Sequence, residues 1–317
     1  MDGIVVVNKP DGWTSFDVVA KIRGVLRTRS VGHTGTLDPM ATGVLVVALG
    51  EATKLVEHLT AADKTYQAAI VFGNETVSLD KMSPVTKTVP VPDALLAALA
   101  EPAKLGESVL LQRALAEELA RTEQVPPAVS AIHVSGERAY DLARRGESVT
   151  LAPRAVQVRA IIATGATLSP APTLFVTITV SKGYYVRSFA RDLAVALGTV
   201  GHLSALHRAR SGDFTLSSSV SPIDTREAIE AAVIPLGSAI RLALPTCELT
   251  EEGTLFALQG KPLLPTHFCE RVEGTVGCFD SLGRLVAMVD VSTTGEGRVR
   301  RGFAHPSRSA SKPTEST

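Results

Sequence analysis

The stretch GHTGTLDP, Gly32 to Pro39, decides how the rest of this chain is interpreted. It is a run of small and polar residues with Leu37 as its one aliphatic side chain, and it precedes VLVVAL, Val44 to Leu49, one of the most apolar runs in the sequence. Asp38 therefore stands at the edge of a predicted buried strand. Asp-Pro is typical of a helix N-cap followed by proline at the first helical position. The alternative is a carboxylate nucleophile or base in a glycine-rich loop, where the backbone can approach a ligand closely.

Composition indicates a folded protein in a reducing compartment. The 317 residues are 45% hydrophobic and 20% charged, which suggests two domains with packed cores. Lys plus Arg equals Asp plus Glu, 32 each, so any nucleic-acid surface must be a local patch. The three cysteines have no zinc-type spacing. No apolar run approaches a membrane helix, and the N-terminal IVVV is too short for a signal peptide. We expect a cytoplasmic protein with no membrane segment and no metal site.

Strands and helices are predicted to mix without regular βαβ alternation over residues 1–235, which favours an α+β fold on a mostly antiparallel sheet. Helical patterns cover 93–122 and 138–145, and a strand is expected at 129–134. From Arg241 short strands and turns dominate, so residues 240–303 are predicted to form a small β-rich domain. The tail, 304–317, is rich in Ser, Pro, Thr, Lys and Arg and is expected to be disordered.

The helix expected after Thr14 begins with a capping-box pattern, Thr14 with Asp17, and continues with apolar residues at helical spacing. Its other face and the residues that follow it carry a run of cations with no intervening acid. These are Lys21, Arg23, Arg27 and Arg29. A solvated face explains them, and a phosphate-facing surface explains them equally well.

Three further features contain residues suited to chemistry or RNA contact. Tyr66 opens a predicted strand beside Asp63 and Lys64, which would keep the strand start near solvent and allow stacking. The stretch SKGYYVRS, 181–188, places two tyrosines beside Lys182 and Arg187, and basic residues interleaved with aromatics suggest nucleic acid. In LHRARSG, 206–212, the two arginines are expected to alternate outward on a strand.

Taken in order along the chain, these motifs resemble the bacterial tRNA pseudouridine synthase B family over residues 1 to about 235. The matching stretches are VNKPDGWTS, GHTGTLDPMATGVL, GEATK, DKTY, QVPPAVSAIHVSGERAYDLARRG, SKGYYVRSFARDL and HRARSG. The chain departs from the family at Val129, where an aromatic is frequent, and in GNETVSLDKMSP, which follows the family only loosely. The segment 101–123 is also longer than expected.

The resemblance implies a fold, a reaction and a set of site residues. It implies a pseudouridine synthase catalytic domain at 1–235 and a PUA-like RNA-binding domain at 240–303. The implied reaction is isomerisation of uridine to pseudouridine at position 55 in the tRNA T loop, on a flipped-out base. The implied catalytic residues are the nucleophile Asp38, with Tyr66 and Arg187. The implied substrate-binding residues are Lys9, His33, Lys182, Tyr185, Leu206 and Arg208.

The implied reaction oxidises nothing and adds no group, so no cofactor or metal is expected, and none has a motif in this sequence. The expected partner is the tRNA T arm, bound by a monomer. A protein that binds tRNA or acts as an RNA chaperone without catalysis, with a structural Asp38, is the main alternative. A metal-dependent hydrolase using His33, Asp38 and His58 is the other, although their spacing is wrong for ligands on one helix.

Overall fold

The apolar run that follows GHTGTLDP lies at the centre of a nine-stranded sheet. Strand β3 (Ala41–Leu49) pairs with β1 (Gly3–Lys9) in antiparallel register, and side chains of both strands are buried on both faces. Strands covered on both faces have continuous apolar runs instead of alternating patterns, which explains the sequence of this pair. The computed structural model describes residues 1–129, 133–134, 137–138 and 151–303.

The large sheet has the strand order β11-β12-β4-β13-β3-β1-β15, with β14 paired to β13 and β2 paired to β3. Its remaining strands are β2 (Val31–His33), β4 (Lys64–Phe72), β11 (Val158–Thr167), β12 (Thr173–Val180), β13 (Gly201–Ser211), β14 (Phe214–Thr215) and β15 (Ile234–Pro235). Every pair is antiparallel except β13 with β3, which run parallel. The predicted mostly antiparallel α+β fold is confirmed.

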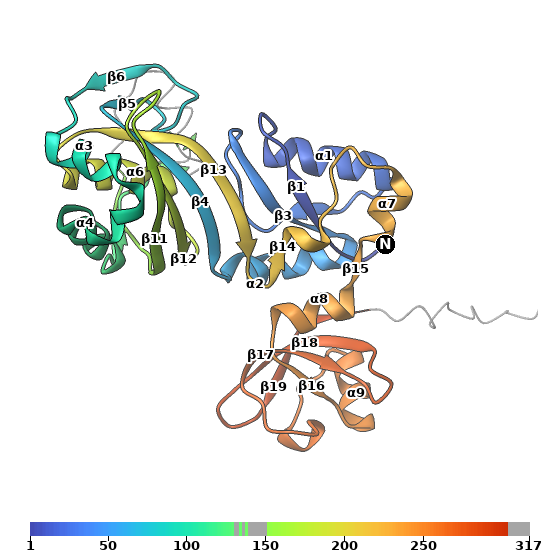
Figure 1. Cartoon of the computed structure of the whole chain (residues 1–317). Coiled ribbons are helices and arrows are strands. Elements are labelled where there is room, and N and C mark those ends of the chain that lie inside the picture. Colours follow the sequence, from blue (N-terminus) through green and yellow to red (C-terminus); the bar gives the residue numbers. More distant parts are fainter. Residues whose placement is uncertain (130–132, 135–136, 139–150, 304–317) are drawn as a thin grey trace, which may run out of the picture.

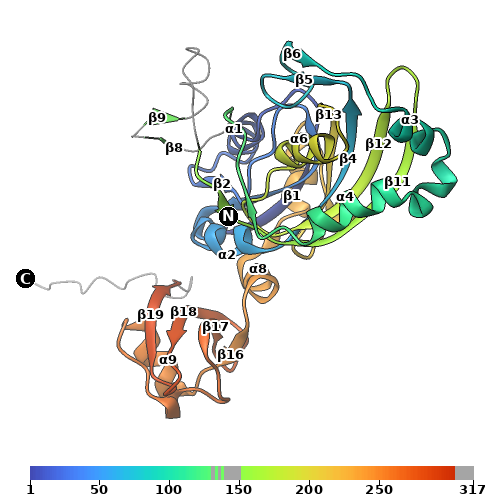
Figure 2. The same ribbon diagram turned by 90° about the vertical axis from the view of Figure 1, so that its left-hand side faces the viewer.

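Helices α1, α3, α4 and α6 pack into one large hydrophobic core with the sheet (Figures 1 and 2). Their bounds are Ser15–Leu26 for α1, Asp93–Ala100 for α3, Val109–Leu119 for α4 and Val186–Ala196 for α6. The capping box predicted for α1 is present, since the Thr14 side chain accepts from the Asp17 amide and Asp17 accepts in return. The helical pattern of 93–122 is divided by the 3₁₀ turn η2 (Pro102–Glu107), because Pro102 cannot continue a helix.

A second core lies on the opposite face of β1 and β3 and connects them to the C-terminal part of the chain. Residues of η1 (Gly50–Leu55) and α2 (Val56–Ala61) belong to this core. Helix α8 (Leu236–Ala243) also contributes to it and leads to a separate small lobe (Figure 1). That lobe is a four-stranded sheet in the order β16-β17-β18-β19. Its elements are β16 (Thr246–Glu248), α9 (Glu251–Leu258), η4 (Pro265–His267), β17 (Gly274–Phe279), β18 (Leu285–Val291) and β19 (Gly297–Gly302). A β-rich, PUA-like C-terminal part was predicted and is confirmed.

Short elements connect the main ones. They are the pairs β5 (Asn74–Thr76) with β6 (Val85–Thr88), β7 (Glu123–Gln124) with β10 (Arg154–Ala155), and β8 (His133–Val134) with β9 (Glu137–Arg138), together with η3 (Leu216–Ser218) and α7 (Arg226–Ala231). Arg138, predicted to begin a helix, lies in a strand instead. The rest of that helix, the middle of the strand predicted at 129–134, and the tail 304–317 lie outside the described residues.

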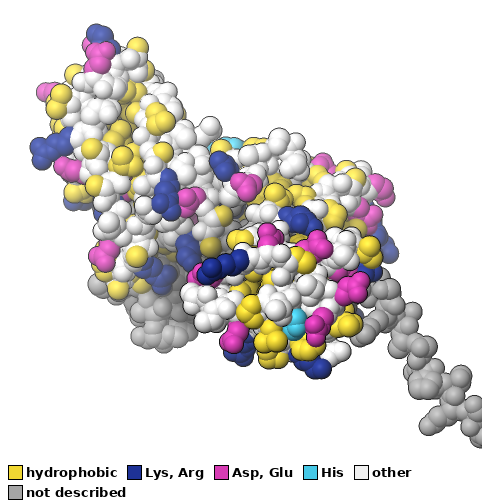
Figure 3. All heavy atoms as spheres, turned by 90° about the horizontal axis from the view of Figure 1, so that it is seen from below, with side chains coloured by type: hydrophobic (Ala, Val, Ile, Leu, Met, Phe, Trp, Pro, Cys, Tyr) yellow, Lys and Arg dark blue, Asp and Glu magenta, His cyan; other side chains and the backbone are white. Residues whose placement is uncertain are grey.

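Charge is mixed on the face of the molecule seen from below, where Lys and Arg lie among Asp and Glu (Figure 3). This agrees with the zero net charge of the chain, and that face carries no large patch of one charge sign. None of the helices in the described parts of the chain is both long and apolar enough to cross a membrane.

Candidate active site

A cavity of about 750 Å³ opens where β3 and β13 run parallel, beside the loop that carries Asp38. Most of the site residues predicted from the sequence line it. They are Asp38, Tyr66, Lys182, Tyr185, Arg187, Leu206 and Arg208. Lys9 and His33 do not line it. The fold thus brings together residues that are far apart in the sequence, from β4, from β13 and from the loop before β3, which are neighbours at the centre of the sheet.

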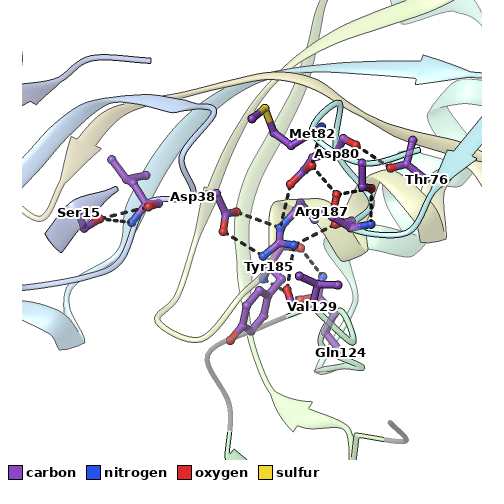
Figure 4. Close-up of polar contacts among 12 residues, drawn as sticks. Ser15, Asp38, Thr76, Asp80, Met82, Gln124, Val129, Tyr185 and Arg187 are labelled. Atoms are coloured by element: carbon purple, nitrogen blue, oxygen red, sulfur yellow. Dashed lines mark hydrogen bonds and ion pairs between the residues drawn. The ribbon is translucent and has the colours of Figure 1, made fainter. Parts of the chain in front are cut away.

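Asp38 and Arg187, which both line the cavity, form an ion pair (Figure 4). Arg187 Nη2 donates to Asp38 Oδ1 at 3.0 Å, and Nε lies 2.9 Å from Oδ2 without the alignment of a hydrogen bond. The Arg187 side chain is only 6% exposed, whereas that of Asp38 is 31% exposed. The carboxylate therefore keeps an open side toward the cavity while a buried guanidinium holds the other side.

Arg187 is itself fixed by the segment 76–83 and by Val129. Its Nη1 donates to Ser78 O at 2.9 Å and to Val129 O at 3.0 Å. A second carboxylate, Asp80, is buried and places Oδ2 3.9 Å from Arg187 Nε (Figure 4). Asp80 Oδ1 accepts from the Met82 amide at 2.9 Å. Arg187 thus lies between two carboxylates.

Sequence reasoning missed Asp80, although the LDK of the loosely matching stretch 73–84 contains it. The signal available was a carboxylate in a stretch that also contains Ser78, Ser83 and Pro84, and such a stretch is common in surface loops and does not indicate burial. Its burial depends on β13, because Leu203 O accepts the Lys81 amide and Leu203 N donates to Leu79 O. That contact joins positions more than a hundred residues apart.

No helix follows Asp38, so the helix N-cap interpretation of Asp38-Pro39 is wrong. Residues 39 and 40 form a turn in which the Ala41 amide donates to Asp38 O at 3.0 Å, and β3 begins at once. The loop is tied to α1 instead, because buried Ser15 accepts the Leu37 amide at 2.8 Å and donates to Leu37 O (Figure 4). The backbone next to the carboxylate is therefore held on both sides.

Lys9 supports the same loop and does not reach the cavity. Its side chain is fully buried, and its ammonium donates to the carbonyls of Pro10, Trp13 and Pro39. Burial lowers the pKa of Lys9 to about 8. Lys9 is not among the residues that line the cavity, and its expected contact with the substrate stays a prediction. Its three carbonyl partners make it a clamp between the first turn and the Asp38 loop.

Arg208 also differs from the prediction. It was expected to point outward on its strand, but the side chain is 2% exposed. Its Nε donates to Val44 O at 2.6 Å and its Nη2 to Gly35 O at 3.1 Å. The strand has a bulge between Arg208 and Arg210, and because a bulge adds a residue, it turns only Arg210 to the surface.

Tyr66 and Leu206 form apolar walls of the cavity. Tyr66 is buried on β4 and stands across the strand pair from Arg208, while Leu206 on β13 is paired with Ala41 at the start of β3. The prediction that Asp63 and Lys64 keep the start of this strand near solvent is wrong for Lys64, which is 6% exposed. Residues 64 and 66 share the inward face of β4, since side chains alternate along a strand.

The two tyrosines of SKGYYVRS have different environments. The backbone of Tyr185 is pinned by Gln124, whose Oε1 accepts the Tyr185 amide at 2.8 Å and whose Nε2 donates to Tyr185 O at 3.1 Å. The buried Tyr184 hydroxyl donates to Glu118 Oε1 at 2.7 Å. Burial raises the pKa of both tyrosines and of Glu118. Gln124 and Glu118 were not anticipated, because both look like ordinary surface residues in the sequence.

His33 lies on β2, where its Nδ1 accepts the Gly35 amide at 3.3 Å. Burial, and then the charge of Arg208, lowers its pKa, so the ring favours the neutral form. Among the described residues, no group of three or more His, Cys, Asp or Glu side chains is placed to hold a metal ion. The arrangement of His33, Asp38 and His58 that the hydrolase alternative requires is not present.

Comparison with known proteins gives matches over most of the chain. Residues 23–186 match the N-terminal domain of the TruB family of pseudouridylate synthases. A protein named tRNA pseudouridine synthase B from Thermobifida fusca is 39% identical over 91% of this chain and 94% of its own length. One of the same name from a Mycobacterium strain is 41% identical over 91% and 92%.

Solved structures agree at the level of the fold. The structure of an H/ACA RNP bound to a substrate RNA containing 2'-deoxyuridine has a chain that superposes with a TM-score of 0.66 at 22% identity. The superposition covers 96% of this chain and 85% of the other. A Cbf5-Nop10-Gar1 complex gives a TM-score of 0.65, also at 22% identity, over 95% and 84% of the two chains.

Proposed function

The chain belongs to the TruB family of pseudouridylate synthases, and from that premise we propose that it isomerises uridine to pseudouridine at position 55 in the T loop of tRNA, with Asp38 as the nucleophile. The observation that carries the proposal is the partly exposed Asp38 carboxylate, held against buried Arg187 in the wall of a cavity. The names of its relatives, tRNA pseudouridine synthase B, support the tRNA substrate.

Every bond and proton that changes in this reaction belongs to the target nucleotide, so substrate and product have the same atoms. The bond from N1 to C1′ breaks, the uracil turns, and C5 bonds to C1′, while C5 loses a proton and N1 gains one. Nothing is oxidised, so the proposal includes no cofactor and no metal. A carboxylate nucleophile divides the exchange of one bond for another into two easier steps. Asp38 is suited to this role because its open side faces the space the uridine would occupy.

A uridine stacked in a folded RNA has to leave its stack to reach Asp38, at a cost of a few kcal/mol. The buried ring of Tyr66 and the side chain of Leu206 offer apolar surfaces for the extruded uracil. Tyr185 lies beside the ion pair, and Lys182 is exposed at the cavity. We assign His33 to the RNA loop that the base has left, because it stands outside the cavity on β2.

The remaining assignments follow from the same proposal. Residues 1–235 contain every proposed catalytic side chain, and residues 240–303 form the RNA-binding domain. Asp38, Tyr66 and Arg187 come from one chain, so we propose a monomer that acts on the T arm. A tRNA substrate also assigns the enzyme to the cytoplasm.

The direct test is incubation with an unmodified tRNA transcript, followed by mapping of pseudouridine. We expect one pseudouridine at position 55, formed equally well in the presence of EDTA. A matched transcript with cytidine at that position should stay unmodified. A wild-type protein that binds the transcript and leaves it unmodified would refute the proposal and favour the RNA-chaperone alternative. Loss of turnover in EDTA, restored by zinc, would refute the metal-free reaction.

A further inference from the structure

The cavity has a cationic end that the proposed chemistry does not use. Lys64 on β4 and Arg208 on β13 both line it, and both are almost fully buried. The two side chains converge on Gly35, since a Cβ atom at that glycine would lie 3.5 Å from Arg208 Nη1 and 3.9 Å from Lys64 Cε. Two positive charges are therefore held close together beside the Asp38 loop.

Neither cation has a carboxylate partner among the described residues. Lys64 Nζ donates to Thr60 O at 2.5 Å and Ala62 O at 2.6 Å, and Arg208 binds the carbonyls of Val44 and Gly35. Asp63, the nearest acid in sequence, accepts from Arg159 Nε at 3.0 Å. Carbonyl dipoles satisfy some of the N–H groups but leave the charge unbalanced. Buried charges are normally paired, so this arrangement needs an anion.

The acids that line the cavity cannot supply that anion. They are Asp38 and Asp80, and both lie against Arg187. At one end of the cavity two carboxylates face the single guanidinium of Arg187, so that end carries an excess of negative charge. The other end, with exposed Lys182 at its edge, has Lys64 and Arg208 and no acid that pairs with them. Burial lowers the pKa of Lys64 to about 8, and the charge of Arg208 contributes in the same direction. Such a lysine regains its full charge when an anion binds beside it.

We propose that Lys64 and Arg208 bind a phosphodiester group that flanks the target uridine. The inference depends on the proposed function, because a uridine that enters the cavity brings its own phosphates only a few bonds from the ribose. Arg208 Nη1, which makes no hydrogen bond to a described residue, and the third Nζ proton of Lys64 provide donors for phosphate oxygens. The phosphate would fix the ribose while the uracil turns at Asp38.

The test uses T-arm RNAs in which one phosphate next to the target uridine, on the 5′ or the 3′ side, is replaced by an uncharged methylphosphonate. We expect one replacement to weaken wild-type binding by about tenfold to a hundredfold. Lys64→Gln should weaken binding of the all-phosphate RNA by a similar factor. The loss of affinity caused by the neutral linkage, called the penalty below, should be mostly absent in this variant. Lys87→Gln makes the same charge change on exposed β6 and should keep the full penalty.

A penalty equal in wild type and Lys64→Gln would overturn the proposal. If Lys64→Gln does not fold, a pH series on the wild type and on Lys64→Arg replaces it. The groups that act on Lys64 are Arg208, Asp63 and Lys182. The anion favours charged Lys64, so the wild-type penalty should be full below its pKa of about 8 and shrink as pH rises above it. Lys64→Arg should keep its penalty over this range, and a pH-independent wild-type penalty would also overturn the proposal.

These readouts are binding constants, so they separate this inference from the proposed function. If the wild type forms pseudouridine and the neutral linkages bind as well as the natural RNA, only the phosphate site is wrong. If no pseudouridine forms at all, the proposed function is wrong, and the binding constants then show whether the cationic pair still recognises an RNA phosphate.

Discussion

At the scale of single residues, the site depends on a carboxylate that is open on one side and held on the other. Asp38 and Arg187 are 149 positions apart, yet two contacts of 2.9–3.0 Å join them. The guanidinium in turn is held by two carbonyls and approached by buried Asp80. Asp38 and Asp80 can each be replaced by asparagine, which removes the charge and nearly keeps the shape of the side chain.

Asp38→Asn is expected to abolish turnover, by roughly 10⁴-fold or more, because the amide keeps the shape but is not a nucleophile. RNA binding should survive, since the cations and Tyr66 are untouched. Stability should fall by about 1–3 kcal/mol, because Arg187 loses one charged partner. Single-turnover pseudouridine formation, tRNA affinity and melting temperature measure the three quantities. Near-wild-type turnover in this variant would exclude Asp38 as the nucleophile.

Asp80→Asn tests whether the second carboxylate positions Arg187. The amide oxygen can still accept from the Met82 amide, but the negative charge behind the guanidinium is lost. We expect kcat to fall while tRNA affinity changes little, with a loss of about 1–3 kcal/mol in stability because the site is buried. Asp290→Asn, at an exposed position of β18, serves as the control. Its amide oxygen can still accept from Thr275 Oγ1, so kcat, tRNA affinity and stability should all change little. An unchanged kcat for Asp80→Asn would show that Asp38 and the two carbonyl partners position Arg187 without the charge of Asp80.

At the scale of elements, the site is built where β3 and β13 run parallel in an otherwise antiparallel sheet. Gly43 on β3 is paired with Arg208 and has a φ of 99°. A Cβ atom there would lie 2.3 Å from Arg208 O. The close approach of the two strands, which brings Leu206 next to the Asp38 loop, therefore requires glycine at this position.

Gly43→Ala is expected to destabilise the protein by about 3 kcal/mol or more, because backbone strain and overlap with a strand carbonyl add together. Gly24→Ala is the matched control. Gly24 lies inside α1 with no atom within 4 Å of its missing Cβ, so alanine there should stabilise by about 0.5–1 kcal/mol. Chemical denaturation of both variants gives the two values. Equal effects would show that the β3–β13 contact is not tight.

At the scale of the whole molecule, the small C-terminal lobe shares a hydrophobic core with the back of the catalytic sheet. Ile240, Phe279, Met288 and Phe303 belong to the same cluster as Ile4 on β1. Arg300 adds an ion pair with Glu57 at 3.2 Å. The lobe therefore contributes to a hydrophobic core that also contains side chains of β1 and β3, in addition to any surface that it presents to RNA.

A chain ending before residue 240 is expected to bind tRNA more weakly and to melt at a lower temperature, because the shared core becomes exposed. Turnover should persist at temperatures where the shortened protein stays folded, since all proposed catalytic residues lie before Leu206. Activity, tRNA affinity and melting should be measured on the same sample. A shortened protein that melts cooperatively but has no activity would show that the lobe completes the active site.

Much of the molecule is determined by local sequence. Continuous apolar runs specify β1 and β3, and the capping box starts α1. Pro102 divides the helical segment 93–122. Hydrophobic period, capping and turn chemistry act over a few residues, so they can be recognised in the sequence without the fold. The motif series identified Asp38, Tyr66, Tyr185, Arg187 and Leu206, all of which line one cavity.

Tertiary structure decided which polar residues are buried and what they contact. Arg208 was expected at the surface and lies inside because of a bulge, Lys9 became a clamp, and Asp80 was not anticipated at all. The cationic pair of Lys64 and Arg208 exists only because β4 and β13 are neighbours in the sheet. Burial of a charge depends on what packs over it, and those groups come from distant parts of the chain. The sequence by itself therefore determines the elements and the reactive residue types, and the fold determines the charge balance around them.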